Sequence, residues 1–149
     1  MKIYIGADHQ GFLLKEELEK YLISKGYDID DEGNQKLNPD DDFPVFASRV
    51  VMKMLASDDI EPRGILLCGS GQGMAMTANR FRGIRAAVAW NEEEAKLARN
   101  DDDSNVLALP AASLKKDKQA MFDIVDVWLK TPFERLARRT RRIKEMDEL

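Results

Sequence analysis

Apolar residues along this chain fall into two patterns, short uninterrupted runs and longer stretches at helical spacing. The short runs predict five strands, at residues 2–7, 27–30, 65–67, 84–90 and 105–109. The helical spacing predicts helices at residues 12–25, 43–56, 92–100 and 115–130, the start of a helix over 74–79, and a last, highly charged helix over 133–149. Apolar runs this short and continuous are typical of strands that a parallel sheet buries on both faces.

The alternation of strands and helices predicts a Rossmann-like α/β fold. Five strands joined by right-handed helical crossovers form a parallel sheet between two layers of helices, a three-layer α/β/α sandwich. A chain of 149 residues is long enough to bury one core, and no linker or internal repeat interrupts it. We therefore expect a single domain over residues 1–149, with an acidic loop over residues 34–42.

A glycine-rich turn, C-G-S-G-Q-G at residues 68–73, follows the third predicted strand directly. A tight turn between a strand and a helix directs backbone N–H groups to one point, which suits a phosphate or a developing oxyanion. Cys68, the only cysteine, begins the turn at the sheet edge where α/β proteins place their sites. The alternative is a turn that only packs a helix on the sheet, with Cys68 as a small buried apolar residue.

Three other polar segments are expected to share this edge with Cys68. They are Asp8-His9 after the first strand, Asn91-Glu92 after the fourth, and residues 100–105 beside the fifth. His9 is the only histidine and could bind a phosphate or move a proton. The alternative is that Asp8 simply caps the helix that follows. A thiol, an anion-binding turn and an Asp-His pair together fit proton transfer on a small phosphorylated molecule.

Several common motifs are excluded by spacing. Met74 stands where a dinucleotide-binding turn needs its third glycine, and no Gly-Lys-Ser/Thr follows the turn as in a P-loop. Ser70 is not in a G-x-S-x-G nucleophile elbow. One cysteine and one histidine make a zinc site unexpected.

Composition narrows the function classes further. Hydrophobic residues make up 44% and charged residues 34%, and no apolar run approaches the ~20 residues of a membrane helix. We expect no membrane association and, with one cysteine and no visible signal peptide, a cytoplasmic location. The net charge of −4 gives no overall attraction to nucleic acid, although residues 135–142 are dense in arginine.

Several stretches in order resemble the ribose-5-phosphate isomerase B family, which also contains the galactose-6-phosphate isomerase subunits. They are I-Y-I-G-A-D-H-Q-G-F near the N-terminus, I-L-L-C-G-S-G-Q-G at 65–73, G-I-R-A at 83–86 and S-N-V-L-A at 104–108. The resemblance implies an aldose–ketose isomerase of a sugar phosphate, with ribose 5-phosphate to ribulose 5-phosphate as the leading reaction. It also implies no metal or organic cofactor, and homodimers or homotetramers whose active sites are shared between chains.

The resemblance implies roles for Cys68 and for the residues expected to lie beside it at the sheet edge. Cys68 matches the base that moves a proton between C1 and C2 of the sugar. Asp8 and His9 match a pair that contacts the sugar and its phosphate. The glycine turn matches the loop whose amides hold the enediolate oxygens, at Gly69, Ser70, Gly71 and Gly73.

The resemblance also implies two arginines, four residues apart on a helix, that bind the phosphate. Arg138 and Arg142 fit this spacing when one residue is inserted after Glu134, and Arg141 is the competing choice. Such a pair lies on one face of a helix and can clamp a dianion. The helix of residues 133–149 is then expected to pack on a partner chain, whereas the alternative for these arginines is a solvated helix face.

One segment departs from the family pattern. Asp101 and Asp102 stand where the family has a His-Asn pair, whose histidine opens the furanose ring. We assign ring opening to Asp101 and substrate contact to Asp102, although an aspartate is ordinarily ionised at neutral pH and then has no proton to donate. This departure leaves open an isomerase of another sugar phosphate, such as galactose 6-phosphate or allose 6-phosphate. Such an isomerase could be one subunit of a pair, and a catalytically weak sugar-phosphate-binding protein also stays open.

Overall fold

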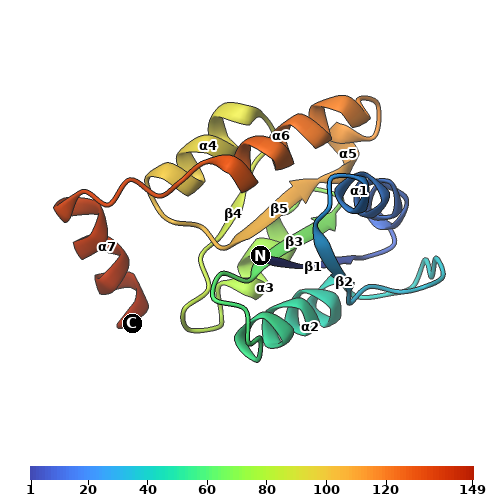
Figure 1. The fold of residues 1–149 in the computed structure, drawn as a ribbon. Helices are drawn as coiled ribbons and strands as arrows, with labels where there is room; N and C mark the ends of the chain where they lie inside the picture. Colours follow the sequence, from blue (N-terminus) through green and yellow to red (C-terminus); the bar gives the residue numbers. More distant parts are fainter.

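A parallel sheet of five strands forms the centre of the computed structural model, which describes residues 1–149 (Figure 1). The strand order is β2-β1-β3-β5-β4. The strands are β1 (Lys2–Ala7), β2 (Asp28–Asp31), β3 (Arg63–Cys68), β4 (Ala86–Val88) and β5 (Val106–Pro110). The helices are α1 (Phe12–Ser24), α2 (Phe43–Leu55), α3 (Gln72–Ala78), α4 (Glu92–Asn100), α5 (Ala111–Leu114), α6 (Lys118–Lys130) and α7 (Ala137–Asp147). The predicted three-layer α/β/α architecture is confirmed.

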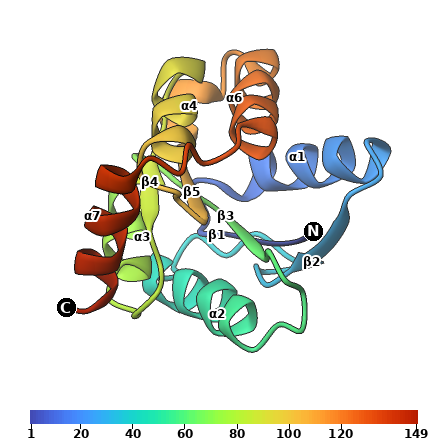
Figure 2. The same ribbon diagram turned by 60° about the vertical axis from the view of Figure 1, so that its left-hand side comes forward.

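The sheet separates two apolar cores. On one face, α1, α4, α5 and α6 cover the sheet, and Leu18 and Trp128 are completely buried there. On the other face α2 and α3 pack, with Val50 and Met74 at the centre (Figure 2). Every residue of β3 and β5 is buried, which explains the uninterrupted apolar runs at residues 65–67 and 106–109.

Three predicted elements are shorter in the structure by three or more residues. The fourth strand is shorter than predicted, covering only residues 86–88, because it lies at the sheet edge and pairs on one side. The predicted helix over 115–130 begins at residue 118, where Asp117 caps it by accepting a 3.0 Å hydrogen bond from Ala120 N–H. The last helix begins at residue 137 instead of 133, after an extended connection from α6.

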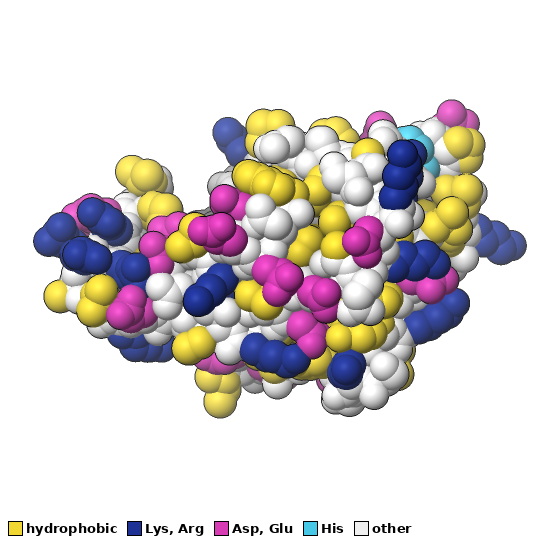
Figure 3. Space-filling view, turned by 90° about the horizontal axis from the view of Figure 1, so that it is seen from above, with side chains coloured by type: hydrophobic (Ala, Val, Ile, Leu, Met, Phe, Trp, Pro, Cys, Tyr) yellow, Lys and Arg dark blue, Asp and Glu magenta, His cyan; other side chains and the backbone are white.

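The helix α7 projects from one side of the molecule in Figure 1, and Asp147 at its end pairs with Arg85. None of its residues is buried. Basic side chains crowd this projecting end in the space-filling view (Figure 3). No helix of the chain, α7 included, is both long enough and apolar enough to cross a membrane.

Candidate active site

The strand order places a topological switch point between the carboxyl ends of β1 and β3. After β1 the chain forms β2 on one side of β1, and it then crosses to form β3 on the other side of β1. The connections that follow β1 and β3 therefore run in opposite directions from this point. Ligands of open α/β sheets bind at such a switch point. The segment after β1 and the glycine turn after β3 meet here, and Asp8 N–H donates a 3.2 Å hydrogen bond to Leu67 O.

Asp8 shapes the turn between β1 and α1. Its Oδ1 accepts hydrogen bonds from the N–H groups of Gln10, at 2.9 Å, and Gly11, at 3.1 Å. Burial raises the pKa of the Asp8 carboxyl, and these two N–H donors partly offset that rise. The N-cap residue of α1 is Gly11 and receives no side-chain cap, so Asp8 closes the turn that precedes the helix and does not cap it. Asp8 Oδ2 has no hydrogen-bond partner in the chain.

His9 is held by an aspartate that sequence reasoning missed. Asp41 Oδ1 lies 2.9 Å from His9 Nδ1 and also accepts the His9 backbone N–H at 2.8 Å. Asn34 Nδ2 donates to the other oxygen of Asp41 at 3.0 Å, and the Asp41 side chain is only 7% exposed. The hydrogen bond from Asp41 raises the pKa of His9, so the structure favours an imidazolium at this edge.

Nothing in the local sequence distinguishes Asp41 from its neighbours. It lies within a run of three aspartates, residues 40–42, in a segment that the polar composition predicts only as a loop. That loop joins β2 to α2 and folds back over the end of β1. The contact with His9 is therefore a product of the tertiary fold.

The glycine turn curls around the sulfur of Cys68. Cys68 ends β3 and is 5% exposed, and the N–H of Gly71 points at its Sγ at 3.1 Å. Gly71 adopts φ +77° at the start of α3, a left-handed conformation that favours glycine. This geometry leaves a donor beside the sulfur, which suits a negatively charged thiolate.

The remaining residues of the turn lie in the same loop. The hydroxyl of Ser70 accepts the Gln72 N–H at 3.3 Å, and Gly69 O accepts the Ala112 N–H at 3.0 Å. Gly73 faces the ring of Phe43 at the start of α2, where an added Cβ would lie 2.7 Å from the ring. The fold thus brings together seven predicted site residues at one edge: Asp8, His9, Cys68, Gly69, Ser70, Gly71 and Gly73.

Asp101 and Asp102 lie at the opposite edge of the sheet. In the parallel register, Cys68 pairs with Pro110 and Gly64 with Val106, and Asn105 O accepts the Gly64 N–H at 3.0 Å. Residues 100–105 enter β5, so they lie about 13 Å along the strands from the Cys68 end. The prediction that this segment shares an edge with Cys68 is wrong, because a segment that enters a parallel strand lies opposite one that leaves it.

Asp101 forms an ion pair at the base of α7. Its Oδ1 lies 2.6 Å from Arg139 Nη2, and Arg139 also pairs with Glu134. The neighbouring Asp102 is exposed. Arg139, which is adjacent to Arg138, therefore already has ion-pair partners within the chain.

Arg138 and Arg142 are exposed on α7 and have no hydrogen-bond or ion-pair partner in the chain. The competing residue Arg141 lies 3.6 Å from Glu145. The start of α7 is tied to the end of α4, since Arg139 Nη1 donates to Asn100 O at 3.2 Å. These arginines are therefore not brought to Cys68 within one chain.

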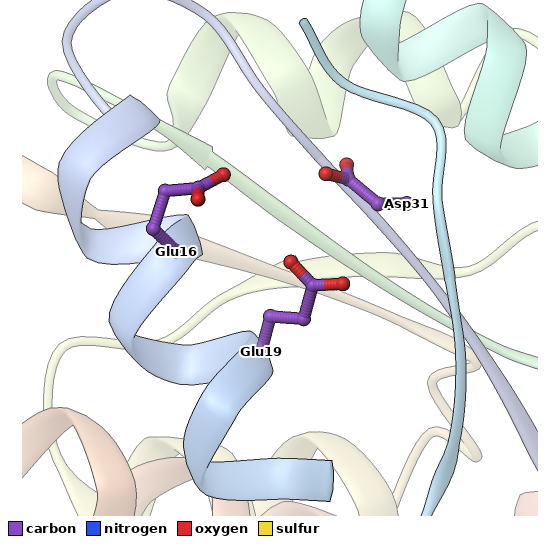
Figure 4. Close-up of side chains that lie close together, drawn as sticks. All are labelled: Glu16, Glu19 and Asp31. Atoms are coloured by element: carbon purple, nitrogen blue, oxygen red, sulfur yellow. The ribbon is translucent and has the colours of Figure 1, made fainter. Parts of the chain in front are cut away.

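A group of three carboxylates is the one candidate for a metal site. Oxygens of Glu16, Glu19 and Asp31 lie within 4.8 Å of one another (Figure 4). However, the completely buried Lys15 ammonium contacts two of them, Glu16 at 2.8 Å and Asp31. Burial disfavours this ammonium, yet the hydrogen bonds outweigh that effect and raise the pKa of Lys15. The cluster thus fits an internal cation better than a metal ion.

The chain matches one protein family and is similar to proteins of known structure. A family model described as Ribose/Galactose Isomerase matches residues 3–146. The chain is 38% identical to ribose-5-phosphate isomerase B of Escherichia coli K12 over 133 residues, covering 89% of this chain and 86% of that protein.

Two solved structures resemble the fold closely. A ribose 5-phosphate isomerase from Thermotoga maritima superposes with a TM-score of 0.92 at 41% identity, over 99% of this chain and 98% of that one. Ribose-5-phosphate isomerase B of Mycoplasma genitalium, with bound ribulose-5-phosphate, gives a TM-score of 0.91 at 36% identity, over 99% and 94%.

Proposed function

The chain belongs to the Ribose/Galactose Isomerase family, and on this premise we propose that it interconverts ribose 5-phosphate and ribulose 5-phosphate. The observation that carries the proposal is the position of Cys68. Its thiol lies at the switch point of the sheet, inside a turn of backbone donors and next to the Asp8-His9 segment. The similarity to a structure that holds ribulose-5-phosphate supports the same substrate here.

In the proposed reaction Cys68 acts as a thiolate base on the open-chain sugar. It takes the proton from C2 of the aldose, and the electron pair moves to the carbonyl oxygen, giving a cis-enediolate. A proton then moves from the C2 hydroxyl to the C1 oxygen, and the same thiol returns its proton to C1, which leaves the carbonyl at C2 and yields the ketose. One base serves both carbons because the C1 and C2 protons are presented on one face of the planar intermediate.

The glycine turn stabilises the intermediate in this proposal. Amide donors of Gly69, Gly71 and Gly73 and the hydroxyl of Ser70 are fixed in place before the reaction begins. Preorganised donors lower the barrier because they need no reorientation as negative charge develops on oxygen. His9, whose pKa is raised by the hydrogen bond from Asp41, then binds the oxygens of the sugar or its phosphate together with Asp8.

The active site is completed by a second copy of the chain in this proposal. Asp101, Asp102, Arg138 and Arg142 lie away from Cys68 within one chain, and α7 buries none of its own side chains. A homodimer in which α7 packs on the partner would supply its two unpaired arginines to the partner's glycine turn. Arg138 and Arg142 would then bind the phosphate, while Asp101 and Asp102 would reach the sugar ring.

A second candidate is an isomerase of a different sugar phosphate, such as galactose 6-phosphate or allose 6-phosphate. The observation that favours it is the Asp101–Arg139 ion pair, which places a carboxylate where the family resemblance implies a ring-opening histidine. The free thiol of Cys68 suits a reducing cytoplasm, where we propose that either activity takes place.

An isomerisation assay of the purified protein with pentose 5-phosphates and hexose 6-phosphates tests the proposal. We expect turnover of ribose 5-phosphate to exceed that of every hexose phosphate. Turnover of a hexose phosphate alone would favour the second candidate. Absence of turnover with all of them would contradict both, and would leave a binding protein or one subunit of a pair.

A further inference from the structure

A basic pocket opens at the amino edge of the sheet, opposite the edge that carries Cys68. Its volume is about 440 Å³, and its walls come from the starts of β1, β3 and β5 and from the connection between α6 and α7. Two carboxylates, Glu61 and Asp103, face five basic side chains in this lining. The basic side chains are Arg63, Arg85, Arg99, Lys130 and Arg135.

Two of the arginines share a single carboxylate. Arg99 Nη1 donates to Asp103 Oδ1 at 2.8 Å, and Arg85 Nη2 donates to Asp103 Oδ2 at 3.1 Å. Arg85 also pairs with Asp147 of α7 at 3.1 Å. Both guanidinium groups are therefore neutralised, and the charge of Asp103 is fully used by them.

Arg63 is left without an adequate counter-charge. It is 8% exposed, its Nη1 donates only to the adjacent Pro62 O at 3.3 Å, and its nearest carboxylate is Glu61 at 3.7 Å. The Glu61 side chain is 60% exposed, so solvent weakens that attraction. Burial and the repulsion from Arg99 lower the pKa of Arg63, as expected of a buried cation that lacks a partner.

We propose that this pocket binds a small phosphate-bearing anion, with Arg63 as its principal ligand. A guanidinium offers a planar fork of donors that matches two oxygens of a phosphate. Arg135 stands at the exposed mouth, where it attracts an anion from solution, whereas Lys130 beside it is paired with Asp126. The volume exceeds that of a simple ion and fits a phosphate with a small organic group or a second phosphate.

Within one chain this pocket is separate from the glycine turn that carries Cys68, and its proposed ligand, Arg63, has no role in the proposed isomerase reaction. The length of β3 lies between Arg63, its first residue, and Cys68, its last. The arginines proposed for the substrate phosphate, Arg138 and Arg142, do not line the pocket. Variants can therefore remove one site without touching the other.

Titration calorimetry with sodium pyrophosphate on the purified full-length protein tests the proposal. We expect Arg63→Met to weaken pyrophosphate binding at least about tenfold, the loss of one charge-assisted contact. The double variant Arg138→Ala/Arg142→Ala is the matched control and should retain the binding. Equal affinity in Arg63→Met, or loss of all binding in the double variant, would overturn the proposal.

Two measurements of Tm show whether Arg63→Met is folded. Because the substitution removes a buried, poorly paired charge, its Tm without pyrophosphate should equal or exceed that of the unmodified chain. Pyrophosphate should raise the Tm of the unmodified chain more than that of Arg63→Met. Arg135 is exposed, so Arg135→Ala should fold normally and bind pyrophosphate a few-fold more weakly. Unchanged pyrophosphate binding in both Arg63→Met and Arg135→Ala would refute the site.

Discussion

His9 and Asp41 are 32 residues apart in the sequence, yet Nδ1 of the first lies 2.9 Å from Oδ1 of the second. This hydrogen bond raises the pKa of His9. We predict that Asp41→Asn lowers that pKa, because an amide does not stabilise the imidazolium as a carboxylate does. His9 is the only histidine, so its ring resonances in an NMR titration report the change directly. Asp40→Asn, at an exposed neighbour, is the control and should leave the titration unchanged.

The same pair makes stability depend on pH with a definite sign. A raised pKa in the folded state means that the stabilising interaction is complete below the ordinary histidine value of about 6.5. It is lost as the pH rises through the folded-state pKa of His9. The Tm difference between the unmodified chain and Asp41→Asn should therefore be larger at about pH 5.5 than at about pH 8.5. A difference that grows with pH would contradict this assignment.

Replacement of the thiol is the sharpest test of the proposed base. Cys68→Ser keeps the size of the side chain but supplies a far weaker base, so we expect kcat for ribose 5-phosphate to fall about 10²- to 10⁴-fold. The circular dichroism spectrum should not change, since the serine fits the same buried position. Turnover close to that of the unmodified protein would rule out Cys68 as the base.

Mixing two inactive variants tests whether active sites are shared between chains. Cys68→Ser damages the glycine-turn side of a site, whereas Arg138→Ala/Arg142→Ala damages the side that α7 would supply. In a mixed two-fold dimer one site carries both defects and the other carries none. After unfolding and refolding together, random pairing should restore about a quarter of the activity. Activity that stays at the level of the separate variants would show that each site lies within one chain.

The left-handed conformation of Gly71 makes it sensitive to any side chain. Gly71→Ala should destabilise the fold by about 1–2 kcal/mol and lower activity, since the added Cβ must adopt φ +77° and would lie 3.1 Å from Val88. Gly26→Ala is the matched control, because Gly26 has φ +86° and nothing within 4 Å of an added Cβ. It should lose comparable stability, measured by urea unfolding, with activity unchanged. Equal losses of activity in both would argue against a role for the turn.

A buried hydrogen bond joins α6 to the segment before β5. Trp128 Nε1 donates to Ser104 Oγ at 2.8 Å, and both side chains are buried. Ser104→Ala leaves the indole N–H without a partner, which should cost about 1–3 kcal/mol of unfolding free energy. Ser113→Ala, at an exposed position, should change stability by less than about 0.5 kcal/mol.

Local patterns in the sequence are enough to predict the layers of the fold and the local parts of the candidate site. Apolar runs and helical spacing are local signals, so the five strands and most helix boundaries follow from them within a few residues. The glycine turn at residues 68–73 is also local, and its place after a buried strand puts Cys68 at a sheet edge before any tertiary contact is known. The turn that Asp8 closes before α1 follows from the same short-range chemistry.

Only the tertiary structure decided which distant residues meet. The partner of His9 comes from a run of three aspartates that differ in position alone, and chain folding selects Asp41. The sheet edge of Asp101 depends on whether its segment enters or leaves β5, which requires the topology. The unpaired charge of Arg63 arises because Asp103 is occupied by Arg85 and Arg99. Such contacts depend on three-dimensional distance, whereas periodicity and turn chemistry depend only on neighbours along the chain.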